Sequence, residues 1–167
     1  MPDRSALYAD LARAYDGEPW HGSSLLTLLG DVDAGMAAAR PIEGGHSIIE
    51  LVLHMAAWAA EVARRLRGST PAAPPEGDWP TPAKGKDAWT EAREKLAAAQ
   101  ADALAALAAC PEERLTAIVG QTRDPSVGSG LTYAAMASGL AQHHAYHGGQ
   151  VALLKRAGER SAVEGGR

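Results

Sequence analysis

The chain has 167 residues, a formal net charge of −4 and a sequence pI near 5.8, so it is long enough for one domain with its own core. Its only cysteine is Cys110, which excludes a disulfide framework and a cysteine-rich zinc site. The acidic balance provides no basic surface, so we expect no nucleic-acid partner.

The N-terminal segment carries charged residues where a signal peptide needs an unbroken apolar core, and we therefore expect a cytoplasmic protein. One stretch, from Pro125 to Leu154, has no Asp, Glu, Lys or Arg and has the length of a membrane span. It nevertheless contains three histidines and two glutamines, which are too polar for a lipid-facing helix. We therefore expect no membrane partner.

The N-terminal part predicts one helix followed by two short helical turns. Asp3 can cap a helix that ends before Gly17, with apolar residues at helical spacing: Leu7, Leu11 and Ala14. Ser23 or Ser24 can cap residues 25–29, and Asp33 can open another turn before Pro41. Trp20 and His21 lie in the loop between these elements, and His21 is a second-tier candidate ligand.

A second long helix is predicted from Ile48 to Leu66. Ser47 and Glu50 have the S-x-x-E spacing of a capping box, and Gly68 ends the helix. Its core positions are Leu51, Met55, Val62 and Leu66.

Two histidines belong to this helix region. His46 precedes the capping box, so we expect its ring to cover the helix start. His54 lies in mid-helix at the edge of the core. Considered alone, His54 is better interpreted as a half-buried histidine bonded to a carboxylate of the same helix, Glu50 or Glu61. A metal-binding histidine motif elsewhere in the core would favour a ligand role instead.

Residues 69–86 contain five prolines and little periodicity, which predicts a long, semi-rigid crossover. Trp79 is expected to hold this crossover against the body, with a cleft-lining role as the alternative. Asp87 can cap a third helix that runs to about Ala109, with leucines in its core: Leu96, Leu104 and Leu107. Cys110 at its end is expected to be structural, and residues 115–130 to be irregular.

The last helix is predicted over residues 131–157, with Lys155, Arg156 and Gly158 as its end. Residues 1–158 would form the single domain, and residues 159–167 a flexible tail. No segment shows strand-like alternation, so the fold class is all-α. The apolar stripe of the last helix consists of Met136, Leu140, Val151 and Leu154, and it also includes His143 and His147.

His143 and His147 are four residues apart, so their rings share one face of the last helix. A buried imidazole needs a hydrogen-bond partner, a charged partner or a metal. The HxxxH spacing alone leaves a pair of satisfied histidines and a metal site about equally plausible. His54 can supply a third nitrogen if its helix packs beside the last one, and three imidazoles leave coordination positions open, as in catalytic sites. Such ligands suit zinc, nickel, iron or copper.

Two segments carry a family resemblance. They are HSIIELVLHMAAW, from His46 to Trp58, and HHAYHGGQ, from His143 to Gln150. The first resembles the H-S-x-x-E-L-x-x-H-x-x-x-W pattern of the DinB/YfiT-like superfamily of metal-binding four-helix proteins. The second is similar to that family's H-D-x-Y-H-x-G-Q pattern, with His144 in place of the aspartate.

The resemblance implies a four-helix bundle in up-down-down-up order, with the long crossover between helices two and three, and a homodimer. It implies that His54, His143 and His147 bind a divalent metal, with zinc or nickel first and iron or manganese as alternatives. Characterised relatives include S-transferases and a maleylpyruvate isomerase that use low-molecular-weight thiols such as mycothiol or bacillithiol. A small-molecule substrate and a thiol cosubstrate are the expected partners.

Three functional hypotheses follow. The first is a metal-dependent thiol S-transferase or hydrolase acting on a small electrophile, with Glu50 and Tyr146 as weak candidates for proton transfer. Capping accounts for Glu50 and packing for Tyr146 without catalysis. The second is a stress-related bundle that binds a metal and a ligand without turnover. The third is a structural bundle whose histidines are core polar residues.

Overall fold

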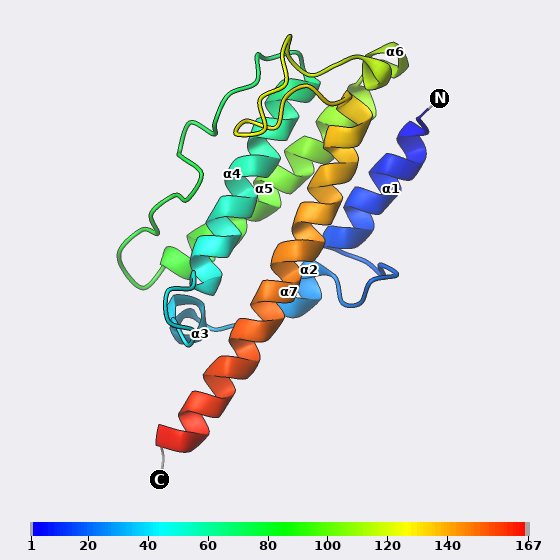
Figure 1. The fold of residues 1–167 in the computed structure, drawn as a ribbon. Helices are drawn as coiled ribbons and strands as arrows, with labels where there is room; N and C mark the ends of the chain where they lie inside the picture. Colours follow the sequence, from blue (N-terminus) through cyan, green and yellow to red (C-terminus); the bar gives the residue numbers. More distant parts are fainter. Residues whose placement is uncertain (1, 166–167) are drawn as a thin grey trace.

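This computed structural model describes residues 2–165, with side chains described as far as Arg160. Within that range the chain forms helices only, and a single pair, Ile118 and Thr132, makes an isolated β-bridge. The helices are α1 (Arg4–Tyr15), α2 (Leu25–Leu29), α3 (Ala34–Ala38), α4 (Ile48–Leu66), α5 (Ala88–Ala109), α6 (Glu112–Thr116) and α7 (Tyr133–Gly165) (Figure 1). The expected all-α class is confirmed.

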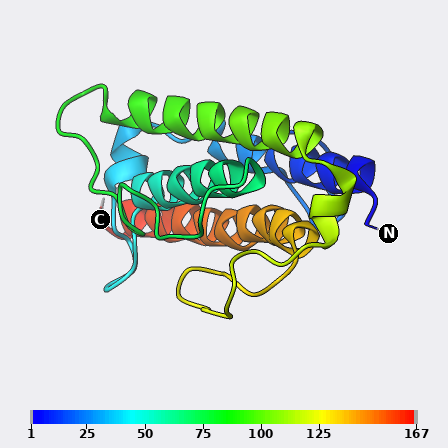
Figure 2. The ribbon, with the colours of Figure 1, turned by 90° about the horizontal axis from the view of Figure 1, so that it is seen from above.

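The four longest helices, α1, α4, α5 and α7, lie side by side (Figures 1 and 2). The most extensive contacts are between α4 and α5, followed by α1 with α7 and α4 with α7. The expected core positions of the second and last long helices are buried: Leu51, Met55, Val62, Leu66, Met136, Leu140, Val151 and Leu154. Of those expected in the first and third long helices, Leu7 and Leu104 are only partly buried. None of the helices in the described part of the chain is long and apolar enough to cross a bilayer.

The ends of α4 follow from local chemistry. At its start, the Glu50 carboxylate accepts hydrogen bonds from the backbone N–H of Ser47 at 2.8 Å and from its hydroxyl at 2.9 Å. At its end, Gly68 takes a φ of +102°, which glycine adopts without strain, and donates its N–H to the Arg65 carbonyl. The predicted bounds of α4 are therefore confirmed, and with them the position of His54.

Two apolar clusters fill the bundle, and the candidate ligands lie between them. On α7 one cluster ends with the partly buried Ala141, and the other resumes at Val151. On α4 the boundary falls between Ala56 and Ala59, one turn from His54. The histidines thus interrupt the apolar core at the same level of both helices.

Some local predictions were wrong. Helix α6 was not predicted, and its last two residues fall at the start of the range 115–130 that was expected to be irregular; the rest of that range is irregular. Asp87 and Ser24 occupy N-cap positions without making a side-chain capping bond. Helix α7 passes Ala157 and continues to Gly165, since Gly158 does not take the positive φ that would end it. Residues 166 and 167 of the expected tail lie outside the described residues, and the domain boundary at residue 158 stays a prediction.

Candidate metal centre

Three histidine side chains from two helices converge in the bundle. Nε2 of His143 lies 3.0 Å from Nε2 of His54 and 3.0 Å from Nε2 of His147. Among the described residues, these three offer ligand atoms that all lie within 4.8 Å of one another, so the group could hold a metal ion. His54 and His147 are buried and His143 is partly buried. The structure therefore brings together the three residues expected as ligands.

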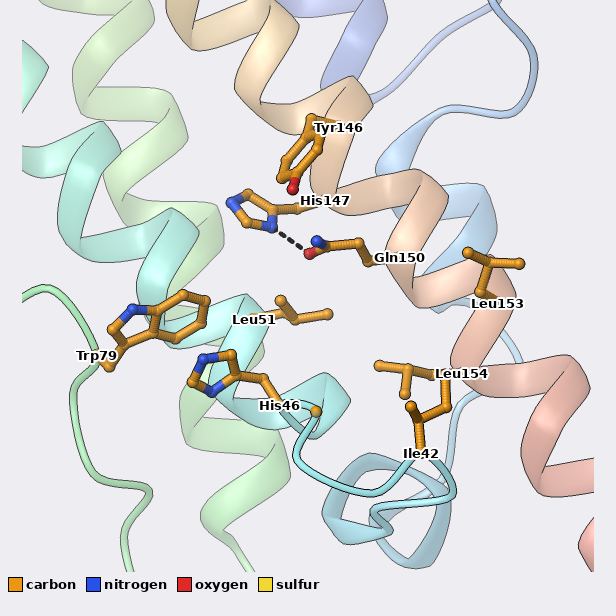
Figure 3. Close-up of a pocket in the computed structure, with 10 residues that line it drawn as sticks. Ile42, His46, Leu51, Trp79, Tyr146, His147, Gln150, Leu153 and Leu154 are labelled. Atoms are coloured by element: carbon orange, nitrogen blue, oxygen red, sulfur yellow. Dashed lines mark hydrogen bonds between the residues drawn. The ribbon is translucent and has the colours of Figure 1, made fainter.

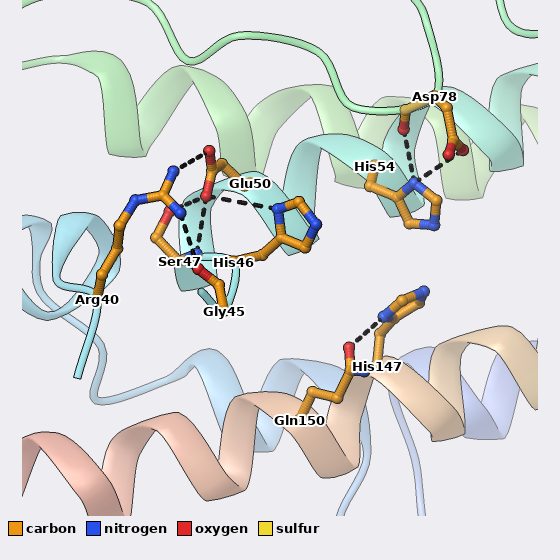
Figure 4. A network of polar contacts seen from close by, with 9 residues as sticks. All are labelled: Arg40, Gly45, His46, Ser47, Glu50, His54, Asp78, His147 and Gln150. Atoms are coloured by element: carbon orange, nitrogen blue, oxygen red, sulfur yellow. Dashed lines mark hydrogen bonds and ion pairs between the residues drawn. The ribbon is translucent and has the colours of Figure 1, made fainter. Parts of the chain in front are cut away.

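The outer nitrogens of two rings fix their tautomers. Nδ1 of His54 lies 2.6 Å from the carbonyl oxygen of Asp78, and Nδ1 of His147 lies 2.7 Å from Oε1 of Gln150 (Figure 4). Both oxygens can only accept, so each Nδ1 carries the proton. In the neutral rings, Nε2 of His54 and of His147 is then an unprotonated lone pair directed toward His143.

His143 cannot satisfy this arrangement by itself. Its Nδ1 is buried without a hydrogen-bond partner. If its proton is on Nε2, it can donate to only one of the two facing lone pairs, and if the proton is on Nδ1, three lone pairs face one another. A cation at the point where they meet removes the conflict, and tetrahedral zinc with bonds of 2.0–2.1 Å separates its ligand atoms by about 3.3 Å. The donor set therefore fits a divalent metal.

The surroundings of His143 and His147 favour their neutral rings. Burial, together with the neighbouring His147 and His54 rings, lowers the pKa of His143 to about 3. Burial also lowers the pKa of His147, although its hydrogen bond to Gln150 opposes the shift. The neutral imidazole is the form that binds metals, so the site is ready for a cation at neutral pH.

The crossover between α4 and α5 closes one side of the centre. Besides its carbonyl bond, Asp78 places a carboxylate oxygen 3.3 Å from Nδ1 of His54 and accepts a hydrogen bond from Nε1 of Trp58 at 2.6 Å. Sequence reasoning missed Asp78, because nothing in this non-periodic segment marks it. The alternative in which Glu50 or Glu61 bonds to His54 is not seen, since these carboxylates pair with arginines instead.

Trp79 follows Asp78 and is held between two histidine rings. It stacks on His46 with ring centroids 3.5 Å apart and on His54 at 4.1 Å. These contacts hold the crossover against the body, as expected. Trp79 and His46 also line a cavity, so the alternative cleft-lining role applies as well.

That cavity, of about 330 Å³, opens beside His147 between α4 and α7 (Figure 3). Its walls are largely apolar and aromatic, and no Asp, Glu, Lys or Arg lines it: Ile42, Gly45, His46, Leu51, Trp79, Tyr146, His147, Gln150, Leu153 and Leu154. The candidate metal centre is therefore accessible to a small, uncharged group.

A comparison with protein families matches residues 20–151 to the family described as the DinB superfamily. The chain belongs to the DinB superfamily. The matched range includes all three converging histidines. No curated protein and no solved structure matches the chain.

His144, where the DinB pattern was expected to have aspartate, does not face the metal centre. It is 1% exposed, and its Nε2 lies 2.9 Å from Oε1 of Gln100 on α5. Gln100 in turn donates to the carbonyl of Leu11 on α1 at 3.2 Å. Burial, then His147, lowers the pKa of His144 to about 4. His144 thus links three helices of this DinB chain.

The weak catalytic candidates differ in their position. Glu50 caps α4 and pairs with Arg40 (Figure 4). Partial burial raises the pKa of Glu50, but the contacts with Ser47 and Arg40 lower it further, so the pKa lies below its usual range. Tyr146 is 65% exposed rather than packed in the core, and its ring contacts His147 edge-on at the cavity. Trp20 and His21 are exposed, and neither lines that cavity.

Proposed function

We propose that this DinB superfamily chain is a metal-dependent enzyme that uses His54, His143 and His147 as ligands to a divalent ion. The observation that carries the proposal is the convergence of three Nε2 atoms, two of which are unprotonated because Asp78 and Gln150 hold the opposite nitrogens. Three protein ligands leave coordination positions open, as in catalytic rather than structural sites. A divalent ion bound there would lower the pKa of a bound thiol or water.

The reaction we propose is thiol-dependent S-transfer to a small electrophile, or its hydrolysis. The uncharged cavity beside His147 is suited to binding an apolar electrophile, since its leucine and tryptophan walls would exclude water from the reacting group. Tyr146 stands at this cavity and remains a candidate proton donor. Glu50 is not part of the proposed chemistry, because its oxygens are engaged by Ser47 and Arg40.

The family resemblance also supports proposals for the metal, the cosubstrate, the oligomeric state and the helix order. Zinc or nickel is the favoured ion, with iron or manganese as alternatives. A low-molecular-weight thiol is the cosubstrate, and the protein is a cytoplasmic homodimer. We also propose the up-down-down-up order for the four long helices, supported by the way α4 and α5 begin at the same end of the bundle in Figure 1.

The test is turnover of monochlorobimane by zinc-loaded and nickel-loaded protein with a panel of small thiols. Conjugation should require both thiol and metal, and His143→Ala should abolish it. His21→Ala, which changes an exposed histidine of the α1–α2 loop, is the control and should retain full activity. Stoichiometric metal binding without turnover of any tested thiol and electrophile would contradict the proposed enzymatic activity and favour the alternative of a ligand-binding protein without turnover.

A further inference from the structure

A second cavity lies on another side of the candidate metal centre. Its volume is about 410 Å³, and it is bordered by His54 and His143, whereas the cavity described above touches His147. Its walls include apolar side chains from α4, α7 and the segment before α7: Val62, Leu131, Met136 and Leu140. Unlike the first cavity, it also contains charged residues, Arg65 and Asp78.

Arg65 reaches this cavity with part of its guanidinium unused. The residue is 1% exposed, its Nε donates to Glu61 at 2.8 Å, and its Nη2 donates to the Ala72 carbonyl at 2.7 Å. No hydrogen bond within the described residues uses Nη1. An added Cβ at Gly128, which also lines the cavity, would lie 3.7 Å from Nη1. A guanidinium carries five N–H donors, so Nη1 is directed toward Gly128 with donors available.

The surrounding charges limit what this nitrogen can bind. Glu61 is fully buried and pairs with both Arg64 and Arg65, and Asp78 carries a second negative charge at the cavity. The positive charges of the two arginines equal the negative charges of the two carboxylates in number. A bound anion therefore meets no surplus positive charge, and the Asp78 and Glu61 carboxylates disfavour a monoanion less than a phosphate dianion.

We propose that this second cavity binds a small monocarboxylate with an apolar body, its carboxylate on Nη1 of Arg65 and its body among the apolar walls. The assignment of this molecule as a substrate rests on the proposed function, but its binding does not require the metal. Arginine is suited to the planar carboxylate, and Trp58, which lines the same cavity, provides an aromatic wall for an aromatic body.

The test is calorimetric titration of the full chain, zinc-loaded and chelated, with 3-phenylpropionate and with its neutral isostere 3-phenylpropionamide. The carboxylate should bind about tenfold more tightly than the amide in both forms, because only it accepts a charge-assisted bond from Arg65. Binding restricted to the zinc-loaded protein would place the carboxylate on the metal and overturn the assignment. Absence of binding to both forms would also overturn it.

Two variants locate the site without disturbing Arg65, which also fixes Glu61 and Ala72. Gly139 lines the second cavity on α7, and a Cβ added there meets no atom within 4 Å, so Gly139→Leu places an apolar side chain at the cavity wall. Gly149→Leu makes the same change on an exposed face of α7, also in open space. Only Gly139→Leu should weaken 3-phenylpropionate binding, by about tenfold or more.

Equal affinity of the two glycine variants for 3-phenylpropionate would show that the molecule binds elsewhere and would contradict the proposal. The outcome is separate from that of the proposed function, since the chelated protein is tested for carboxylate binding and the loaded protein for turnover. If the chain binds no metal but binds the acid more tightly than the amide, the carboxylate site would be supported and the proposed metal-dependent activity would be contradicted.

Discussion

The carbonyl oxygen of Asp78 lies 2.6 Å from Nδ1 of His54, so the long connection between α4 and α5 supports a candidate metal ligand. The same residue accepts a hydrogen bond from Trp58, one helical turn after His54. The connection thereby fixes both the tautomer and the orientation of His54, in the way that outer partners orient metal-binding histidines.

Asp78→Ala removes the carboxylate contact to Trp58 and His54 but leaves the backbone carbonyl. We expect zinc affinity to fall by about tenfold, the lower end of the range for outer partners of metal ligands. Competition titration with a chromophoric chelator measures this change. Glu76→Ala, an exposed acidic residue of the same connection, is the control and should change nothing. Unchanged affinity in Asp78→Ala would mean that the carbonyl alone orients His54.

Gln150 has the corresponding role for His147, with its side-chain oxygen 2.7 Å from Nδ1. Gln150→Leu leaves that N–H without its partner and frees the ring to rotate. Zinc affinity should therefore fall by about 10–100-fold in the same titration. Gln142→Leu makes the same change at an exposed glutamine of α7 and should retain affinity. Equal affinities of the two variants would refute an orienting role for Gln150.

The buried histidines predict acid sensitivity of the metal-free protein. The pKa values of His143 and His144 are lowered from 6.5 to about 3 and about 4. Below pH 6.5 the unfolded chain therefore binds protons at these histidines that the folded protein does not bind. Stability from these groups is present above pH 6.5 and is lost as the pH falls below it. The free energy of unfolding should decrease by up to about 1.4 kcal/mol per pH unit for each histidine.

Urea unfolding of the chelated protein between pH 7.5 and 5 measures this slope. His144→Gln should reduce it by the contribution of one histidine, whereas His21→Gln, on an exposed loop, should not. A His144→Gln slope equal to that of the parent protein would show that His144 does not contribute to the acid sensitivity.

Much of the candidate centre could be predicted from helical periodicity. The i, i+4 spacing of His143 and His147 on an apolar stripe, and His54 within well-marked helix ends, were sufficient to bring the three residues together. Their role as ligands stays a prediction. The Gln150 contact was also accessible in principle, since residues three apart on a helix are neighbours.

The contacts made by Asp78 and Trp79 could not be predicted. They lie in a proline-rich connection without periodicity, and their positions depend on how that connection packs over α4. The charge partners of α4 were likewise set by tertiary structure, since Glu61 contacts both Arg65 and the backbone N–H of Ala72. His144 is rotated by about 100° from His143 around α7, so it meets α5 instead of the centre.

The sequence contains features that indicate the missed helix α6 and the true end of α7. Pro111 followed by Glu112 and Glu113 is typical of a helix start, and α6 begins there. Gly158 was taken as the end of α7, but a glycine ends a helix only where its backbone turns left-handed, and Gly158 stays helical.

We infer that His54, His143 and His147 bind one divalent ion. Elemental analysis should compare the untagged protein with His54→Ala, His147→Ala and the control His46→Ala, which alters a neighbouring histidine outside the converging group. We predict near-stoichiometric metal in the parent protein and in His46→Ala, and its loss in the other two. A parent protein that carries no metal and cannot be loaded with zinc, nickel, iron or manganese would show that these histidines do not form a metal site.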